Sequence, residues 1–329
     1  MSRIRIGIVG YGNLGKSVEL GCYQNKDMEI VGVFSRRDPK TIKTRKEGVP
    51  VYHLDEVKNM VDDIDVMILC GGSAKDIPTQ GPMLAAMFNT VDAFDTHAKI
   101  PEYFDQMDKV AKESGKVAVV ASGWDPGMFS INRLYAEAIL PEGSTYTFWG
   151  KGVSQGHSDA IRRVDGVKKA VQYTIPIEDA IKAIKSGENP ELSTREKHLR
   201  ECYVVAHEGA SKEQIEKDIV TMPNYFADYD TTVHFISEEE FDANHQGLPH
   251  GGLVIRNGKT GLNNEHNQII EYNLKLESNP DFTASVLLAY ARAAYKMNKE
   301  GIKGAKTVVD IAPVYLSMRT AEEIRREMI

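Results

Sequence analysis

Short apolar runs alternate with helical patterns along the first part of the chain. The runs predict strands at Ile4–Val9, Ile30–Phe34, Val66–Cys70, Thr90–Phe94 and Val117–Ala121. Most of these runs are continuously apolar, which is typical of strands that helices cover on both faces. Strands that alternate with helices favour a parallel sheet with crossover connections. The pattern therefore predicts a doubly wound α/β domain over residues 1–125.

The polarity pattern changes after Pro126. Longer strand patterns of mixed polarity follow at Thr145–Trp149, Lys169–Ile175, His198–Ala206, Thr231–Ile236, Leu253–Arg256 and Asn267–Leu276. Helical patterns interrupt them at Glu178–Lys185 and after Ser211, where Gln214 completes a capping-box signature. We expect residues 126–279 to form a second, α+β domain with an open sheet that is mixed or antiparallel.

A long helical pattern opens the C-terminal segment. Asn279 can cap this helix, Pro280 suits its first turn, and Gly301 can end it. The run Val308–Ile311 is again short and β-like. We therefore expect residues 280–329 to return to the first domain and pack on it.

Charge and composition narrow the class of protein. The chain has 329 residues, and 40 Lys+Arg against 47 Asp+Glu give a formal charge of −7, which argues against nucleic-acid binding through phosphate contacts. No apolar run approaches the roughly 20 residues of a membrane-spanning helix. Met1–Gly10 lacks a signal-peptide pattern. We expect a cytoplasmic protein with no membrane partner.

The three cysteines do not suggest a disulfide framework or a metal site. Cys22, Cys70 and Cys202 are scattered along the chain, and their spacing fits no zinc pattern. We expect all three to be reduced and buried, and we predict no metal ligands.

A glycine-rich turn, Gly10-Tyr11-Gly12-Asn13-Leu14-Gly15, lies between the first strand and the first helix. The first glycine permits a tight turn, the second lets the backbone approach a pyrophosphate, and the third lets helix and strand pack closely. The helix N-terminus adds N–H donors and partial positive charge. In this strand-turn-helix context the motif predicts a Rossmann-type dinucleotide site.

The end of the second strand bears on which nicotinamide cofactor is bound. Where an NAD enzyme usually places a carboxylate for the ribose, this chain has Ser35-Arg36-Arg37, and no acid follows before Asp38. Two guanidiniums suit a 2′-phosphate, so the sequence favours NADP. A solvated basic turn is the alternative.

Further strand ends extend the predicted cofactor crevice. Small and polar residues lie at the carboxyl ends of three strands there, at the switch-point edge where doubly wound sheets bind ligands. They are Cys70, Gly71, Gly72 and Ser73, then Asp92, Ala93 and Phe94, then Ser122, Gly123, Pro126 and Gly127.

Two acids follow consecutive strands at the same edge. Asp95 and Asp125 are expected near the nicotinamide, where carboxylates attract a cationic substrate group. Oxidation at a carbon that bears an amine requires the ammonium to lose a proton first, and anionic groups that hold the nitrogen serve that reaction. The alternative is an alcohol dehydrogenase, in which nearby His97 would act as the base.

Several longer runs resemble meso-diaminopimelate dehydrogenases nearly end to end. They are 10–18, 34–37, Gly123–Arg133, Thr147–Gly150, Ser154–Ala160, Gly247–Gly252 and Asn279–Ser285. The resemblance implies NADP-dependent, reversible oxidative deamination of the D-centre of meso-2,6-diaminopimelate to L-2-amino-6-oxopimelate and ammonia, in lysine and cell-wall precursor biosynthesis. It also implies a homodimer built from the second domain.

The same resemblance assigns roles to individual residues. It implies that Asp95 and Asp125 hold the reacting ammonium. It implies that the pocket around the reacting end is shaped by Trp124, Trp149, Gln155 and Gly156. It implies that the distal end of the pocket, which holds the carboxylate of the unreactive L-centre, is formed by Arg200, Thr174, His250 and Asn267. The last assignment leaves Asn264 as an alternative, because the loop before Asn267 is longer than in the family pattern.

Alternation within His198–Ala206 supports the role of Arg200 independently. It puts Arg200 on the same face as Cys202 and Val204, an unfavourable place for a guanidinium unless an anion meets it. A salt bridge to Glu178 or Glu201 is the alternative to a ligand carboxylate.

Other functions remain open from the sequence. A dihydrodipicolinate reductase, or a homoserine or aspartate-semialdehyde type dehydrogenase, would share only the Rossmann half. A semialdehyde enzyme would need a nucleophilic cysteine, for which Cys70 and Cys202 have no flanking motif. A non-catalytic NADP(H)-sensing protein would bind the nucleotide without turnover.

Overall fold

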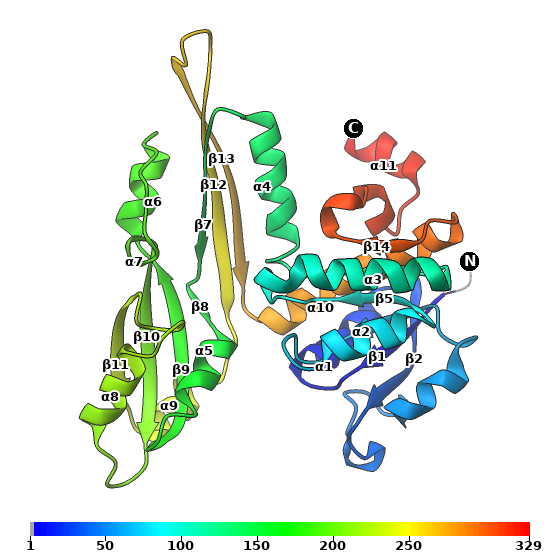
Figure 1. Ribbon diagram of the computed structural model, residues 1–329, viewed down its shortest axis with the longest axis horizontal. Coiled ribbons are helices and arrows are strands. Elements are labelled where there is room, and N and C mark those ends of the chain that lie inside the picture. Colours follow the sequence, from blue (N-terminus) through cyan, green and yellow to red (C-terminus); the bar gives the residue numbers. More distant parts are fainter. Residues whose placement is uncertain (1–2) are drawn as a thin grey trace. The chain divides into compact units, whose positions relative to one another are not determined.

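A computed structural model describes residues 3–329 (Figure 1). The chain divides into two compact units, one made of the residues up to 131 together with 280–329, the other of residues 132–279. The first boundary lies at 131 and not at 125. Phe129 is fully buried and Ile131 packs against the core of the first unit, so the turn after Pro126 stays with that unit.

The first unit is built on a parallel sheet. Within residues 3–329 its seven strands are β1 (Ile4–Val9), β2 (Met28–Ser35), β3 (Val51–His53), β4 (Val66–Leu69), β5 (Asn89–Asp92), β6 (Val117–Val119) and β14 (Gly304–Lys306). Their order is β14-β6-β5-β4-β1-β2-β3, and every neighbouring pair is parallel. The chain reverses direction across the sheet between β1 and β4, which makes that edge the switch point.

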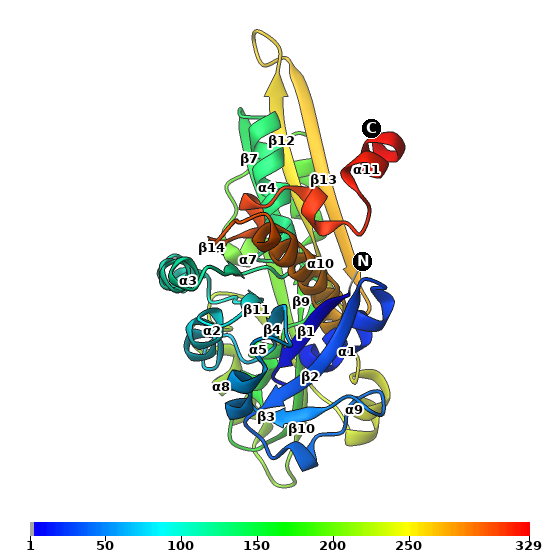
Figure 2. The same ribbon diagram turned by 90° about the vertical axis from the view of Figure 1, so that its right-hand side faces the viewer.

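Helices cover both faces of this sheet (Figure 2). On one face, α1 (Asn13–Gln24) and α10 (Asn279–Lys299) share a core with β1, in which Ile6, Ile8 and Leu288 are fully buried. On the other face lie α2 (Ile77–Ala85), α3 (Ile100–Ser114) and the 3₁₀ helix η2 (Leu54–Met60). The predicted doubly wound α/β fold is confirmed.

The strand in the C-terminal segment is not the predicted one. Val308–Asp310 forms a 3₁₀ helix (η4), and the strand that joins the sheet is β14, a few residues earlier. Thr307 donates to the Asp310 carboxylate through both its backbone N–H and its hydroxyl, each at 2.7 Å. This local cap outweighs the β-propensity of the valines. The chain ends with η5 (Pro313–Leu316) and α11 (Ala321–Met328).

The second unit contains two sheets. The expected mixed sheet is formed by β8 (Gly152–Val153), β9 (Val167–Pro176), β10 (His198–Ala206) and β11 (Asp230–Phe235), in the order β11-β10-β9-β8 with only β10–β11 parallel. The antiparallel alternative also occurs, as a second sheet that contains β7 (Gly143–Trp149), β12 (His250–Thr260) and β13 (His266–Leu276). The sequence did not predict two separate sheets.

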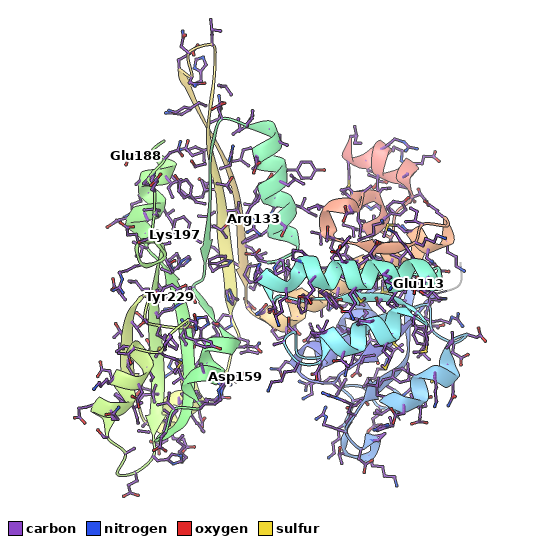
Figure 3. The ribbon with its side chains drawn as sticks, viewed as in Figure 1. Glu113, Arg133, Asp159, Glu188, Lys197 and Tyr229 are labelled. Carbon is purple, nitrogen blue, oxygen red and sulfur yellow. The ribbon has the colours of Figure 1, made fainter. Side chains whose placement is uncertain are left out.

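Helix α4 (Met128–Ile139) enters this unit at Asn132. The helices that follow it are α5 (Gln155–Ile161), α6 (Glu178–Lys185), α7 (Thr194–Lys197), α8 (Lys212–Val220) and α9 (Glu238–Asn244). Helix α4 runs beside the antiparallel sheet (Figure 1). Arg256 of β12 donates to the carbonyl of Leu140 just after the end of α4, at 2.5 Å from Nη2. Arg133, labelled in Figure 3, reaches Thr147 of β7 from the same helix. These bonds hold α4 to the sheet.

Candidate functional site

The glycine-rich turn lies at the switch point of the first sheet. Gly10 has φ +88°, and a Cβ there would lie 3.1 Å from the backbone of Cys70 and Gly71. A Cβ on Gly15 would lie 2.2 Å from the carbonyl oxygen of Gly10, whereas one on Gly12 would meet nothing within 4 Å. The first and third glycines therefore permit the turn and the close packing of α1, and the second leaves space open for a ligand.

A cavity of about 620 Å³ opens at this turn. Nine of the predicted cofactor-binding residues line it: Gly10, Tyr11, Gly12, Ser35, Arg36, Arg37, Cys70, Gly71 and Gly72. Two others, Asn13 and Leu14, form the first turn of α1 and do not line it. The structure therefore brings the ends of β1, β2 and β4 together around one cavity.

Sequence reasoning missed an acid in this cavity. Asp76, which precedes α2, also lines it and accepts from Arg36 Nη2 at 2.5 Å and from the N–H of Gly72 at 2.9 Å. Arg37 instead donates to the carbonyl of Tyr11 at 2.8 Å. No acid lies between Ser35 and Asp38 in the sequence, as noted above, but the fold brings the carboxylate of Asp76 to Arg36 from the segment after β4.

Asp92 is placed differently from its prediction. It ends β5 and is fully buried, and its carboxylate accepts from the N–H of Ala121 and of Phe94, each at 3.0 Å, and from Tyr103 Oη at 2.8 Å. Burial raises its pKa to about 6, although these three donors oppose the shift. The Asp92 side chain fixes the loops after β5 and β6 and has no surface to offer a cofactor.

Phe94 and Ser122 are also structural. The Phe94 ring is buried against Tyr103, with ring centroids 4.5 Å apart, and the buried Ser122 hydroxyl donates to the carbonyl of Asp92 at 2.8 Å. Their side chains are therefore not cofactor ligands. Ala93 is half-buried and packs against the core beside α10.

The two predicted catalytic acids follow these buried anchors. Asp95 is exposed just after β5, and its N–H donates to Ser73 Oγ at 2.9 Å, which ties its loop to the end of β4. Asp125 is half-buried after β6. Because β5 and β6 are parallel neighbours, both acids follow the carboxyl edge of the sheet. His97, the alternative base, begins a 3₁₀ helix (η3, His97–Lys99) and is exposed.

The Asp125 turn is compact. Gly127 has φ +134°, and a Cβ there would lie 1.6 Å from the carbonyl oxygen of Gly123. Trp124 is 8% exposed and meets Phe129 edge to face, with ring centroids 5.4 Å apart. Glycine at position 127 is therefore required for the fold of this turn. Pro126 beside it is half-buried.

Arg200 and Thr174 lie side by side in the second unit. They are register partners on β10 and β9, and Arg200 Nη1 donates to Thr174 Oγ1. The guanidinium also lies 3.9 Å from the centroid of the Tyr229 ring, a cation–π contact. Figure 3 labels Tyr229, which lies just before β11.

Arg200 is a buried cation without an anion. Arg200 is 6% exposed, and among residues 3–329 no Asp or Glu forms an ion pair with it. Its Nε is buried with no hydrogen-bond partner, and burial lowers the pKa of the guanidinium. The proposed alternative, a salt bridge to Glu178 or Glu201, is wrong. A buried, unpaired guanidinium is costly unless a ligand supplies the anion.

Other predicted substrate-binding residues meet at the same end of β9. Gly152 of β8 pairs with Thr174, and a Cβ on Gly152 would lie 2.6 Å from His250 Cα. Trp149 ends β7, and a Cβ on the following Gly150 would lie 2.1 Å from the carbonyl oxygen of Thr174. We call this group, formed by Trp149, Thr174, Arg200 and His250, the β9 corner.

Gln155 and Gly156 follow the same corner. Both are exposed and form the first turn of α5, directly after β8. The structure therefore brings six of the predicted substrate-binding residues of this unit to one region: Trp149, Gln155, Gly156, Thr174, Arg200 and His250.

Asn267 does not join them. It lies near the start of β13, where it is exposed and accepts from Lys259 Nζ. His250 pairs with Leu276 at the other end of the same strand pair, which at about 3.4 Å per residue puts Asn267 roughly 30 Å away along the strand. The alternative Asn264 lies in the turn beyond, where it is exposed, so neither asparagine reaches the corner.

Two histidines flank Arg200, of which His157 is half-buried and His198 is buried. His157 Nδ1 lies 2.7 Å from Ser154 Oγ, and His198 is 2% exposed. Burial, with the positive charge of Arg200 adding to it, lowers the pKa of each imidazole to about 4. Both rings are therefore neutral at pH 7, and Arg200 carries the positive charge of this region.

This arrangement predicts how stability depends on pH. A histidine whose pKa is near 6.5 when unfolded and about 4 when folded takes up its proton first in the unfolded state, so stability is full above pH 6.5 and falls as the pH is lowered toward 4. Between pH 7 and pH 5 His157 is expected to account for a loss of about 2 kcal/mol.

The measurement is urea unfolding at both pH values for the wild type and for His157→Gln. Gln keeps a polar contact with Ser154 but does not titrate, and the opposite contribution of Asp92 cancels in the difference. The variant should lose about 2 kcal/mol less than the wild type over this interval. An equal loss in both proteins would show that His157 is not held neutral by burial.

The thiols are inert. Cys22, Cys70 and Cys202 are free and buried, as predicted, and burial raises the pKa of each thiol. None of them is a thiolate nucleophile of the kind a semialdehyde dehydrogenase uses. Within residues 3–329 no group of three or more His, Cys, Asp or Glu side chains is placed to bind a metal ion. No helix in that range combines the length and apolar character needed to cross a bilayer.

Comparison with known proteins identifies the family. The family model "Diaminopimelic acid dehydrogenase C-terminal domain" matches residues 123–278. The meso-diaminopimelate D-dehydrogenase of Acetivibrio thermocellus is 67% identical over 100% of this chain and 98% of that protein. A crystal structure of a sixfold variant of Clostridium tetani meso-DAPDH with DAP is 55% identical, with a TM-score of 0.93 over 99% of this chain and 100% of that one.

An engineered D-amino acid dehydrogenase bound to NADP⁺ is also similar. It is 48% identical, with a TM-score of 0.88, and the match covers 100% of both chains. The identity extends over both units, and not only over the nucleotide-binding half that many dehydrogenases share. The chain belongs to the meso-diaminopimelate D-dehydrogenase family.

Proposed function

We propose that the protein catalyses the NADP-dependent, reversible oxidative deamination of the D-centre of meso-2,6-diaminopimelate. The products are L-2-amino-6-oxopimelate, ammonia and NADPH, and the reverse reaction is a reductive amination that serves lysine and cell-wall precursor synthesis. The DAP and NADP⁺ complexes of similar enzymes support this assignment.

The buried, unpaired Arg200 carries the proposal. Meso-diaminopimelate has a carboxylate at each end, and the one at the unreactive L-centre would supply the anion that the β9 corner lacks. Arg200 would bind it through charge-assisted hydrogen bonds, with Thr174 and His250 beside it. An amino acid with an apolar side chain would leave the guanidinium unpaired, so the corner selects for a second acidic end.

Asp95 and Asp125 would hold the reacting ammonium. Buried Asp92 fixes both of their loops, which keeps the two acids at the carboxyl edge of the sheet where the nicotinamide binds in folds of this kind. Trp124, buried beside Asp125, would form an apolar wall. Two negative charges stabilise an ammonium and orient its carbon for hydride loss.

The chemistry follows from these positions. The D-centre ammonium gives one proton to water or to a carboxylate. The C–H bond at that centre then breaks, the hydrogen leaves with both bonding electrons as hydride, and the nitrogen lone pair forms a C=N bond. Water adds to the imine carbon, the C–N bond breaks, and ammonia departs with a ketone in place. NADP⁺, when bound, supplies the hydride acceptor.

The residues of the first unit fit this cofactor. The cavity of about 620 Å³ joins the open space at Gly12 to Ser35, Arg36 and Arg37. The first turn of α1 contains no acid, so its N–H donors would be available to a pyrophosphate. Arg36 and Arg37 would hold the 2′-phosphate, with Arg36 exchanging Asp76 for the phosphate.

Replacing Arg36 by alanine should therefore weaken NADP⁺ selectively. The KM for NADP⁺ is expected to rise about tenfold through loss of one charge-assisted contact, while the KM for NAD⁺ stays within about twofold. Steady-state kinetics with both nucleotides measures this. Lys40→Ala, which removes another exposed cation nearby, is the matched control. An equal change for both nucleotides would exclude a 2′-phosphate role.

The spacing of substituted positions in a similar enzyme supports the proposed distal site and indicates a different asparagine for it. The C. tetani variant is substituted at Gln, Thr, Arg, Pro, His and Asn positions, the first five separated by 19, 26, 49 and 1 residues. Gln155, Thr174, Arg200, Pro249 and His250 have the same separations here. The position that corresponds to the sixth by count is Glu277, and the nearest asparagine is Asn279, two residues later.

We therefore propose Asn279 in place of Asn267. The N–H of Asn279 donates to the carbonyl of Leu248 at 2.9 Å, so Asn279 lies beside the Pro249–His250 segment that reaches the β9 corner. Pro249 belongs to the same segment, because its carbonyl accepts from the N–H of Val153 at 2.8 Å. From the sequence, Asn279 is predicted only as the cap of the helix that begins there.

The test is NADP⁺ reduction with meso-, LL- and DD-diaminopimelate side by side. We expect a high rate with the meso isomer and none with LL, which lacks a D-centre. NADPH oxidation with 2-amino-6-oxopimelate should require ammonia. Oxidation without ammonia would favour a reductase, and tight nucleotide binding with no turnover of any isomer would favour a sensing protein.

We further propose a cytoplasmic homodimer formed through the second unit. The three free thiols suit a reducing compartment. Light scattering after size-exclusion chromatography should give twice the chain mass of 36.6 kDa. A mass of one chain would contradict the dimer.

A further inference from the structure

His198 joins the two sheets of the second unit at the β9 corner. It begins β10 and its side chain is 2% exposed. The backbone N–H of Trp149, the last residue of β7, donates to His198 Nε2 at 2.8 Å. The two rings also stack, with centroids 5.4 Å apart and planes 24° apart. One buried side chain thus contacts both the backbone and the indole of Trp149.

The bond fixes the protonation state of the ring. A backbone N–H can only donate a hydrogen bond. Nε2 of His198 must therefore be unprotonated, and the single ring proton must be on Nδ1. A second proton is opposed by burial and by the charges of Lys197 and Arg200. Figure 3 labels Lys197, which directly precedes His198. The acceptor is therefore present throughout the neutral pH range.

Trp149 needs such an anchor because of its place in the sheet. It pairs with Gly252 at the end of the β7–β12 ladder, and Gly150 after it has φ +112°. Trp149 is 37% exposed, so packing leaves over a third of its surface uncovered. The contact with His198 covers one ring face and ties the strand end to β10, the strand that carries Arg200.

We propose that His198 is a positioning residue that holds Trp149 at the β9 corner and thereby sets the shape of the substrate pocket beside Arg200. The inference rests on the proposed function for its consequence in catalysis, and on the hydrogen bond and ring stack for its structural part. It names His198 as a determinant of substrate affinity that need not touch the substrate.

Tryptophan fluorescence tests the structural part without any enzyme assay. The chain has two tryptophans, so Trp124→Phe leaves Trp149 as the sole emitter. In that background His198→Leu, which removes both the acceptor and the ring, should raise the acrylamide quenching constant at least about twofold. His198→Gln, which restores an acceptor without a ring, should lie between Leu and the parent.

The matched control is His234→Leu. His234 also stacks on an aromatic ring of the same sheet, that of Tyr203, with centroids 4.8 Å apart. It should leave Trp149 quenching unchanged. Equal quenching in the parent and in His198→Leu would overturn the proposal, as would an equal rise in His234→Leu.

Kinetics with Trp124 intact test the consequence. His198→Leu should raise the KM for meso-diaminopimelate about tenfold and leave the KM for NADP⁺ within about twofold, with partial recovery in His198→Gln. Equal losses for both substrates, with a lowered Tm, would mean a general structural role and overturn the proposal. If the wild type turned over no diaminopimelate, the proposed function would fail, and the fluorescence result would still decide the role of His198.

Discussion

Replacing Arg200 by methionine is expected to lower kcat/KM for meso-diaminopimelate by at least about 100-fold. The substitution removes a charge-assisted bond to the distal carboxylate, worth about 3 kcal/mol. Methionine keeps an apolar stem in the same buried place beside Thr174 and Tyr229. Because the guanidinium has no anion within residues 3–329, its removal should not lower the free energy of unfolding.

Loss of activity without loss of stability is the specific result. Steady-state kinetics and urea unfolding of the same preparation measure the two quantities. Arg195→Met is the matched control, since Arg195 is an exposed neighbour that pairs with Asp230 and should show unchanged kinetics. An unchanged kcat/KM in Arg200→Met would exclude the distal-carboxylate role. A large loss of stability would show that Arg200 serves the fold.

The Asp95→Ala variant is expected to lose at least about 100-fold in kcat/KM while its Kd for NADPH stays within about twofold. The carboxylate is exposed at the edge of the sheet, where it can meet an ammonium, and its N–H bond to Ser73 survives the substitution. Loss of a charged partner for the reacting nitrogen accounts for about 2.7 kcal/mol, a 100-fold change.

Nucleotide titration by fluorescence and initial rates test this split. Asp105→Ala, which removes an exposed acid from α3 of the same unit, is the control and should leave both quantities unchanged. Equal losses in NADPH affinity and in catalysis would mean that Asp95 supports the nucleotide site and not the amine.

The dinucleotide-binding half was largely predictable because its signals are local. Gly10, Gly12 and Gly15 follow from sterics within one strand-turn-helix unit, and the structure shows the close approaches that two of them permit. The continuous apolar runs likewise indicated a sheet covered on both faces. Asp76 was not predictable, because no spacing rule links the residue before α2 to the arginines after β2.

Strand ends were harder to interpret than strands. Asp92 is the last residue of β5 and Asp95 lies three residues later, yet Asp92 is fully buried and Asp95 is exposed. Alternation stops where a strand ends, so the sequence does not say which acid turns inward. The buried position of Asp92 depends on Ala121 and Tyr103, which come from other elements.

The second unit shows where periodicity succeeds and where it fails. Alternation correctly put Arg200 on the buried face of β10. It did not reveal two sheets, because pairing between distant strands leaves no local signal. Asn267 was aligned across a loop that is longer than in the family pattern, and the hairpin register puts it at the opposite end of the strand pair from His250.

A crystal structure with NADP⁺ and meso-diaminopimelate bound tests the central claim most directly. We predict one substrate carboxylate within about 3.2 Å of the Arg200 guanidinium, and the amine of the opposite centre within the same distance of Asp95 or Asp125. A complex in which Arg200 contacts no part of the substrate, with the distal carboxylate held by other residues, would contradict the account.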